Sequence, residues 1–312
     1  MKNQKNSLKV AFAGSGPYAE PIFESLIKNF KDITLIVKSG TPKDSKIIQV
    51  AEKHKIGIIQ ASNKDDFHAS IQGFHPDTAV IVSFGIIIGG NTLDIPKHGF
   101  INVHYSLLPK YRGPSPVQSA ILNGDKLTGI TFQIMHEKID EGDVLYQEEV
   151  PVEPNDTTIT LAERMAKLSA EKLPKVIKNY VSGSVTPQKQ TGEPTYSRII
   201  KKEDGHIDWK QPAENIERMM RAYIPWPSAY TFWDGKMLKI HEAKVLDQSS
   251  GKKPGTFLEV SDSGLDQNDK QFGIQTGQGI LIIKKIQLEG KKPMTTADFV
   301  RGSRNIIGGV LE

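Results

Sequence analysis

Short apolar runs alternate with helix-like stretches through the first half of this 312-residue chain, and this alternation constrains the fold more than any other feature. Strand-like runs cover residues 8–13, 33–38, 56–60, 78–83, 100–104 and 128–135. Helix-like stretches cover residues 19–29, 46–54, 65–72 and 159–180, the last opened by capping residues at 155–157. Alternating strands and helices favour a parallel sheet with helices on both faces. We therefore expect an α/β fold with a Rossmann-like, doubly wound sheet.

The second half of the chain has a different pattern. The segment 181–197 is rich in Ser, Thr, Gly and Pro and predicts a linker, which we expect to wrap over the first domain. Beyond it, an amphipathic helix over 213–221 precedes several strand-sized runs, and Asp234-Gly235 is a strong hairpin signal. Such short strands predict a small β-barrel. We expect a first domain over residues 1–182, a linker over 183–203 and the barrel over 204–312.

Composition limits the class of protein, because 38% hydrophobic content allows a substantial core while no stretch approaches the ~20 apolar residues of a membrane span. The basic start superficially resembles a signal peptide, but its apolar run is too short and passes into a glycine turn. Cysteine is absent, which excludes disulfides, thiolate nucleophiles and cysteine zinc sites. The net charge of +4 fits a nucleic-acid partner and an ordinary solvated surface equally well. We expect a monomeric cytoplasmic enzyme with no membrane partner.

A glycine motif follows the first strand. The sequence GSGPYA at 14–19 fits the dinucleotide fingerprint G-x-G-x-x-A, which is typical of nicotinamide oxidoreductases. An acid should then end the second strand to bind the ribose hydroxyls, and that strand ends instead in Lys-Ser-Gly at 38–40. We therefore expect a tight strand-to-helix turn beside the active-site crevice, where a phosphate or the ribose of an acceptor can approach.

The residues most informative for chemistry lie between 101 and 140. Asn102 and His104 are two residues apart on the run 100–104, so their side chains leave the same face of the sheet. The run passes directly into the Pro-rich stretch SLLPKYRGPSP, which marks the carboxyl end of a strand, where open α/β sheets bind ligands. With a later carboxylate, Asp140, these groups suit acyl transfer, which needs an oxyanion donor, a proton carrier and an acid to tune it.

Two other interpretations apply to the same residues. Taken singly, Asn102 and Asp140 are common turn or cap residues, and His104 can be a hydrogen-bonded histidine at a strand end. A catalytic zinc normally has three protein ligands, and His104, His136 and Asp140 are of the right type. The zinc interpretation leaves Asn102 without a role, so we expect no metal.

The chain resembles a known family along nearly its whole length. The segments INVHYSLLPKYRG and IDEGDVLY resemble the signature of the 10-formyltetrahydrofolate-dependent formyltransferases. Further similar segments are KVAFAGSGPYAEPIFESLI, VIVSFGIII and KPGTF, and HIDWKQPAENIERMMRAYIPWPSAY resembles the methionyl-tRNA branch through its IDW and PWP segments. The resemblance implies the formyltransferase fold followed by an OB-like barrel that binds tRNA.

The resemblance also implies a reaction: transfer of a formyl group from the co-substrate 10-formyltetrahydrofolate to the α-amino group of methionyl-tRNA in translation initiation. Attack of the amine on the formyl carbon gives a tetrahedral oxyanion, which Asn102 and a protonated His104 would stabilise. Asp140 would raise the pKa of His104, keeping it a donor near neutral pH, and would accept the proton of the nucleophile through water. No covalent enzyme intermediate is needed.

By the same resemblance, three segments are expected to bind the folate, in an apolar slot with a few fixed backbone polar groups. They are the loop Phe84, Gly85, Ile86, Ile87 and Ile88, the segment Ser106, Leu107, Leu108 and Pro109, and the facing wall His136, Glu137, Lys138 and Ile139. The side chains of residues 86–88 are equally suited to a hydrophobic core. Contacts to tRNA are expected from Gly14, Lys43, Lys46 and Arg112.

Some features depart from the family pattern and bear on the acceptor. Methionyl-tRNA formyltransferases usually carry a longer basic insertion after the second strand, whereas only SGTPKDS at 39–45 precedes the next helix here. Tyr105 replaces a small residue or proline, and Gly89-Gly90 replaces a proline region. The short loop favours a second acceptor class, an amino-sugar nucleotide, which the IDW and PWP segments oppose. A non-catalytic RNA- or folate-binding protein is a third alternative, which the three candidate catalytic residues oppose.

Overall fold

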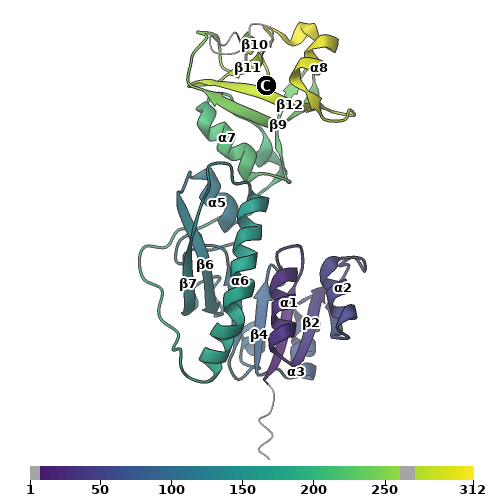
Figure 1. Ribbon diagram of the computed structural model, residues 1–312, viewed down its shortest axis with the longest axis vertical. Coiled ribbons are helices and arrows are strands. Elements are labelled where there is room, and N and C mark those ends of the chain that lie inside the picture. Colours follow the sequence, from purple (N-terminus) through teal and green to yellow (C-terminus); the bar gives the residue numbers. More distant parts are fainter. Residues whose placement is uncertain (1–7, 261–270) are drawn as a thin grey trace, which may run out of the picture. The chain divides into compact units, whose positions relative to one another are not determined.

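The structure, a computed structural model, describes residues 8–260 and 271–312, and these form two compact units (Figure 1). Unit 1 contains residues up to Val117, Lys126–Val152 and Thr160–Arg198. Unit 2 contains Gln118–Asp125, Glu153–Ile159 and Ile199–Glu312. Across the two described ranges, no helix is both long enough and apolar enough to span a bilayer.

Unit 1 is built on a seven-stranded sheet with the strand order β3-β2-β1-β4-β5-β6-β7. The first five strands run parallel and the last two pair antiparallel with their neighbours. The strands are β1 (Lys9–Gly14), β2 (Asp32–Lys38), β3 (Gly57–Ala61), β4 (Thr78–Val82), β5 (Phe100–His104), β6 (Leu127–Ile134) and β7 (Val144–Pro151). The expected doubly wound sheet is confirmed, and β7 is an additional edge strand that the sequence pattern did not predict.

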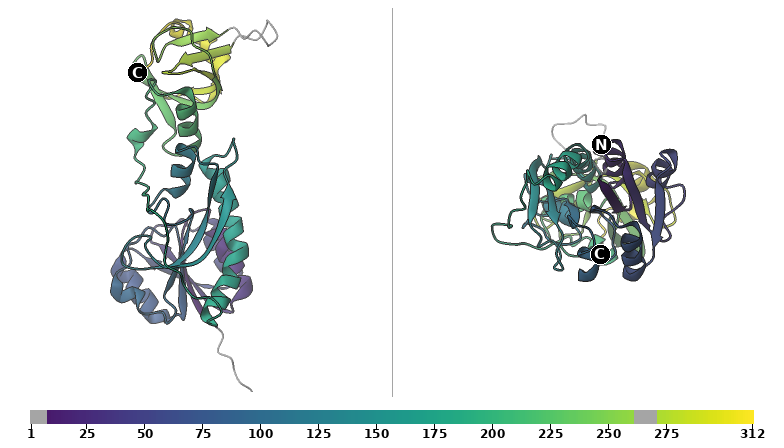
Figure 2. Two further views of the ribbon diagram at one scale, coloured as in Figure 1. Left: turned by 90° about the vertical axis from the view of Figure 1, so that its left-hand side faces the viewer. Right: turned by 90° about the horizontal axis from the view of Figure 1, so that it is seen from below.

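Helices cover both faces of this sheet (Figure 2). They are α1 (Glu20–Asn29), α2 (Lys46–Lys53), α3 (Lys64–Phe74), α4 (Gly90–Leu93), α5 (Pro116–Leu122) and α6 (Thr158–Val181). The alternation of side chains along β1 explains the two layers, because neighbouring residues of a strand face opposite ways. Ala11 packs in one core with Phe67 of α3, whereas the ring of Phe12 lies 5.1 Å from that of Phe23 of α1.

Unit 2 is an antiparallel sheet with the order β10-β11-β12-β9-β8. Its strands are β8 (Ala229–Trp233), β9 (Lys236–Leu246), β10 (Phe257–Val260), β11 (Gln271–Gln275), β12 (Ile280–Leu288) and β13 (Met294–Thr295), with helices α7 (Ala213–Ala222) and α8 (Thr296–Gly302) and 3-10 turns η1 (Lys202–Gly205) and η2 (Arg304–Ile306). Asp234 and Gly235 join β8 to β9, both at positive φ (50° and 69°), as a two-residue hairpin turn requires. The predicted hairpin is therefore confirmed.

The C-terminal residues close this sheet. Glu312 exchanges two backbone hydrogen bonds of 3.2 Å with Phe232 of β8, at one edge. At the other edge, the amide of Phe257 in β10 donates to the carbonyl of Gly309 (2.9 Å), and the amide of Leu311 donates to the carbonyl of Gly255 (2.9 Å). Both edge strands therefore pair with one short segment, which leaves fewer open backbone groups and gives the expected small barrel.

Leu311 packs in the core of unit 2 with 3% of its surface exposed, whereas its neighbour Val310 is 48% exposed. We predict that Leu311→Ala lowers the free energy of unfolding of unit 2 by about 2–5 kcal/mol, because it leaves a cavity where the barrel closes. Val310→Ala is the matched control, with an expected change within about 0.5 kcal/mol. All three tryptophans, Trp209, Trp226 and Trp233, lie in unit 2, so denaturant titration followed by tryptophan fluorescence measures this transition. Equal losses in the two variants would contradict the closure.

Candidate active site

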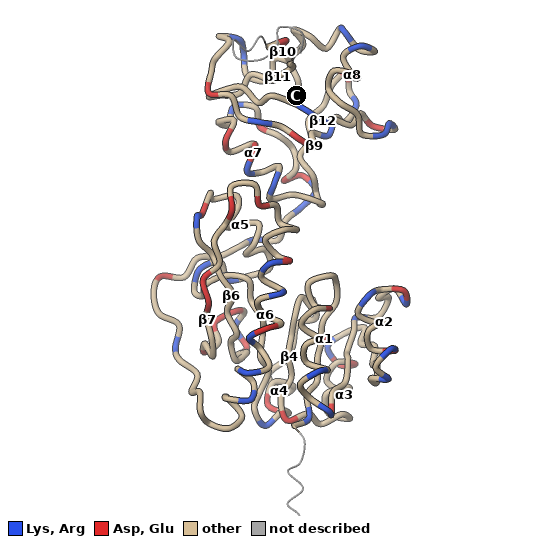
Figure 3. The backbone as a smooth tube through the Cα atoms, in the orientation of Figure 1, with Lys and Arg blue, Asp and Glu red and all other residues tan. Residues whose placement is uncertain are grey.

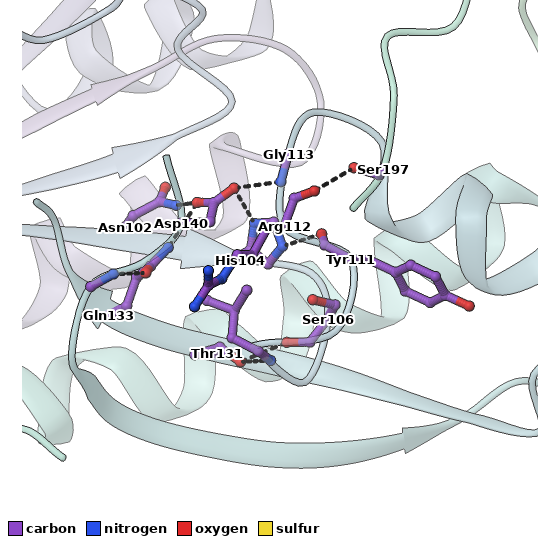
Figure 4. Close-up of polar contacts among 12 residues, drawn as sticks. Asn102, His104, Ser106, Tyr111, Arg112, Gly113, Thr131, Gln133, Asp140 and Ser197 are labelled. Carbon is purple, nitrogen blue, oxygen red and sulfur yellow. Dashed lines mark hydrogen bonds and ion pairs between the residues drawn. The ribbon is translucent and has the colours of Figure 1, made fainter. Parts of the chain in front are cut away.

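Strand β5 presents Asn102 and His104 on one face at its carboxyl end. The antiparallel pairing with β6 sets Asn102 opposite Gln133 and His104 opposite Thr131. The loop after β6 then brings in Asp140, whose backbone has a positive φ of 54°. The structure thus brings together the amide, the imidazole and the carboxylate that the sequence singled out (Figure 4).

The carboxylate of Asp140 is surrounded by donors. Its Oδ1 accepts from Asn102 Nδ2 at 3.1 Å and from Gln133 Nε2 at 2.8 Å. Its Oδ2 accepts from the backbone amide of Gly113 at 2.8 Å and lies 3.6 Å from His104 Nδ1. Both oxygens are thus satisfied by neutral donors from separate segments, which fixes the direction in which the carboxylate faces the imidazole.

The imidazole of His104 is buried, with 5% of the residue exposed. Its Nε2 lies 3.0 Å from the carbonyl oxygen of Tyr111, and a carbonyl only accepts, so Nε2 carries a hydrogen. Burial lowers the pKa of His104, and this effect outweighs the raising effects of Asp140 and of the Tyr111 hydrogen bond. Asp140 raises the pKa as expected, but the net shift is downward, opposite to the direction expected from Asp140 alone. The neutral ring has its unprotonated Nδ1 facing Asp140.

Residues around the loop after β6 form a second layer that the sequence did not indicate. Gln190, in the segment after α6, donates to the carbonyls of Asp140 and Gly142, both at 2.8 Å. Arg112, which is expected from the sequence to contact tRNA, lies 3.2 Å from Glu141 Oε1 and also donates to Gln190, with 12% of its side chain exposed. Gln133 could have been recognised from the sequence, because it is an amide side chain within the apolar run 128–135. Nothing in the polar segment 183–198 distinguishes Gln190 from its neighbours.

Two of the three expected folate segments adjoin one another. In the loop 84–88, Phe84 and Ile88 are buried in a core cluster, while Ile87 is exposed. Residues 136–139 are all exposed, and the side chain of Glu137 occupies the space next to Gly90 where a Cβ would lie. The core interpretation therefore holds for Phe84 and Ile88, and Ile87 is available to a ligand.

The third segment, residues 106–109, packs mostly inward. The hydroxyl of Ser106 donates to the carbonyl of Lys110, and the carbonyl of Ser106 accepts from Thr131 Oγ1 at 2.6 Å. Thr131 Oγ1 also accepts from the amide of Leu108 at 3.1 Å. The segment's own hydrogen bonds thus fix its backbone beside His104.

The other expected site residues lie in varied surroundings. Gly14 is buried at the end of β1, where a Cβ would lie 2.9 Å from the carbonyl oxygen of Val82, so only glycine fits this turn. Lys43 and Lys46 are exposed in and after the short loop that follows β2. Within residues 8–260 and 271–312, no group of three His, Cys, Asp or Glu side chains is placed to hold a metal ion.

Two family models match the chain: one described as formyl transferase over residues 8–177, and one described as formyl transferase, C-terminal domain, over residues 199–304. A methionyl-tRNA formyltransferase of Clostridium tetani is 35% identical over 98% of this chain and 100% of its own length. Solved structures that share the fold include the following two. The N-formyltransferase from Helicobacter canadensis in complex with folinic acid and dTDP-3-aminofucose has a TM-score of 0.66 and 19% identity, covering 88% of this chain and 98% of its own. Methionyl-tRNA formyltransferase from Clostridium thermocellum has a TM-score of 0.55 and 20% identity, covering 78% and 95%.

The protonation of His104 is directly testable. Because burial outweighs the nearby charge, we predict an NMR titration midpoint for the His104 ring below the ordinary value of 6.5. Asp140→Asn removes the one raising charge and should shift the midpoint further down. The His104→Gln spectrum assigns the signal. A wild-type midpoint above 6.5, or an upward shift in Asp140→Asn, would show that charge rather than burial dominates.

Proposed function

The chain belongs to the formyl transferase family, and from this premise we propose that it transfers the formyl group of 10-formyltetrahydrofolate to the α-amino group of methionyl-tRNA. The observation that carries the chemistry is the convergence of Asn102, His104 and Asp140 at the end of β5. The acceptor is supported by 35% identity to a methionyl-tRNA formyltransferase over the full length of that relative. Since aminoacyl-tRNA is made and used where translation occurs, we expect a cytoplasmic enzyme.

In the first step the neutral α-amino group attacks the formyl carbon, and the carbonyl oxygen becomes an oxyanion. Asn102 Nδ2 carries two hydrogens, and one of them is bonded to Asp140. The second hydrogen is the donor for the oxyanion, a role in which one group contributes ~2.7–4 kcal/mol to the transition state. Gln133 also donates to the same oxygen of Asp140, so that oxygen stays satisfied if Asn102 turns towards the substrate.

In the second step His104 moves a proton. Its Nδ1 accepts the proton that the amine loses on forming the new C–N bond, and Asp140, 3.6 Å away, stabilises the resulting imidazolium. The same proton then passes to N10 of the folate as the bond between N10 and the formyl carbon breaks. Atoms and charges balance over the cycle, and His104 returns to its neutral form. A neutral, buried imidazole therefore suits a proton carrier better than a permanent cation.

The folate is held, in this proposal, by the three segments 84–88, 106–109 and 136–139. Exposed apolar side chains, Ile87 and Ile139, lie on two of these segments, and such side chains suit the faces of a pterin. Gly85 has a φ of 74° and no Cβ, so the edge of the pterin ring can approach the backbone closely at this residue.

The tRNA is held by unit 2 and by the lysines of the 39–46 region. Lysines occur along β9 and β12 (Figure 3), and Lys284 and Lys285 are exposed on β12. Such side chains bind phosphates without reading sequence. An amino-sugar nucleotide is the second candidate acceptor, favoured by the short 39–45 loop and by the fold shared with the Helicobacter canadensis enzyme.

Transfer of labelled formyl from 10-formyltetrahydrofolate tests the function, with methionyl-tRNA and an amino-sugar nucleotide offered in parallel. We predict labelling of methionyl-tRNA alone, with an affinity for the tRNA that falls steeply as salt is added. Labelling of the sugar alone would show that the acceptor is the amino-sugar nucleotide and not methionyl-tRNA. Labelling of neither acceptor would refute the proposed function.

Substitution of the catalytic residues tests the mechanism separately. We predict that His104→Ala and Asp140→Asn lower kcat by 10²-fold or more, in the range expected on removing a positioned proton carrier, while folate affinity changes little. Asp143→Asn is the matched control, because the Asp143 carboxylate pairs with Lys189 at 2.9 Å rather than with the site. Near-normal turnover in either catalytic variant would contradict the mechanism.

A further inference from the structure

One side-chain amide outside the sheet holds the backbone on both sides of the candidate catalytic carboxylate. Gln190 lies in the segment between α6 and η1 and belongs to unit 1. Its Nε2 donates to the carbonyl of Asp140 and to the carbonyl of Gly142, each at 2.8 Å. The two residues flank Glu141, so one amide group fixes the whole turn 140–142.

The oxygen of the Gln190 amide accepts two hydrogen bonds from Arg112. Gln190 Oε1 accepts from Arg112 Nε at 3.2 Å and from Arg112 Nη2 at 2.8 Å. The third nitrogen of the same guanidinium, Nη1, lies 3.2 Å from Glu141 Oε1. Both amide hydrogens and both oxygen lone pairs of Gln190 are therefore occupied. All three residues of the turn are held by this Gln190–Arg112 pair.

The turn needs such support because its backbone is unfavourable. Asp140 has a φ of 54°, a left-handed conformation that is uncommon for residues with a Cβ and that aspartate adopts more readily than most. Residues in such conformations persist where the surroundings fix them, and they are common at functional sites. Gly142 approaches the carbonyl of Ile134 so closely that a Cβ would collide with it. The backbone is thus confined at both residues, and both of their carbonyls accept from Gln190.

We propose that Gln190 is a positioning residue for formyl transfer, which sets the carboxylate of Asp140 towards His104 by donating to the carbonyls of residues 140 and 142. This inference rests on the proposed function. The alternative is that Gln190 only attaches its segment to unit 1. That attachment has independent support, because Gln188 exchanges two backbone hydrogen bonds with Val144 (2.7 and 2.8 Å) and the amide of Ser197 donates to the carbonyl of Arg112 (2.7 Å).

Gln190→Glu separates the two roles. A glutamate still accepts from Arg112, so the segment keeps its anchor, but its carboxylate can no longer donate to the two carbonyls. We expect kcat for formyl transfer to fall by about 10²-fold, the size of effect that a displacement near 1 Å produces. The KM for the folate should stay close to wild type. Gln188→Glu is the matched control, since this side chain is exposed and bonds only the carbonyl of Thr186 within the described structure.

Two further readouts distinguish positioning from attachment. In the Asp140→Asn background, Gln190→Glu should lower kcat little further, because it acts through the group already removed. Gln190→Met, which is neutral and of similar length, should lower the His104 NMR titration midpoint, because a displaced Asp140 raises it less. The NMR readout needs no substrate, so it decides the inference even where wild-type transfer fails. Wild-type kcat in Gln190→Glu, a fully multiplicative double variant, or an unchanged His104 midpoint in Gln190→Met would overturn the proposal.

Discussion

The hydrogen-bond shell of the Asp140 carboxylate is the constraint on which the rest of the site depends. Its donors come from β5 (Asn102), from β6 (Gln133) and from the loop after β5 (Gly113), so three segments meet on one group. The register Asn102↔Gln133 between β5 and β6 puts both amides within reach of one oxygen. The backbone at 140 can then remain left-handed because its carbonyl is also held. Without this shell, β5 would present an imidazole with no fixed acid beside it.

The competition between burial and charge decides what the imidazole does. A carboxylate at 3.6 Å favours the protonated ring, and burial of nearly the whole residue favours the neutral one. Burial is the larger effect, and it lowers the pKa of His104. The hydrogen on Nε2 is committed to Tyr111, which leaves Nδ1 as the nitrogen that gains and loses a proton during the reaction. The same surroundings that hold the ring in place therefore also set its chemical role.

Local patterns in the sequence were enough to predict the parallel sheet, the hairpin at 234–235 and the common face of Asn102 and His104, because these depend on periodicity and turn chemistry. The rest depends on contacts between distant segments. Gln190 reaches Asp140 across 50 residues, and neither composition nor spacing marks it. Arg112 was expected to contact tRNA, and its partners in unit 1, Glu141 and Gln190, became known only from the fold. The direction of the His104 pKa shift depended on burial, which sequence alone does not give.

In the proposed mechanism, formyl transfer depends on the position of the carboxylate at 140 and not on its charge alone. Single-turnover transfer by Asp140→Glu tests this most directly, because glutamate keeps the charge and displaces the carboxylate by one methylene within the same shell of donors. We predict a loss of about 10²-fold or more with folate affinity retained. Turnover close to that of the wild type would contradict the claim, because a negative charge anywhere near His104 would then suffice.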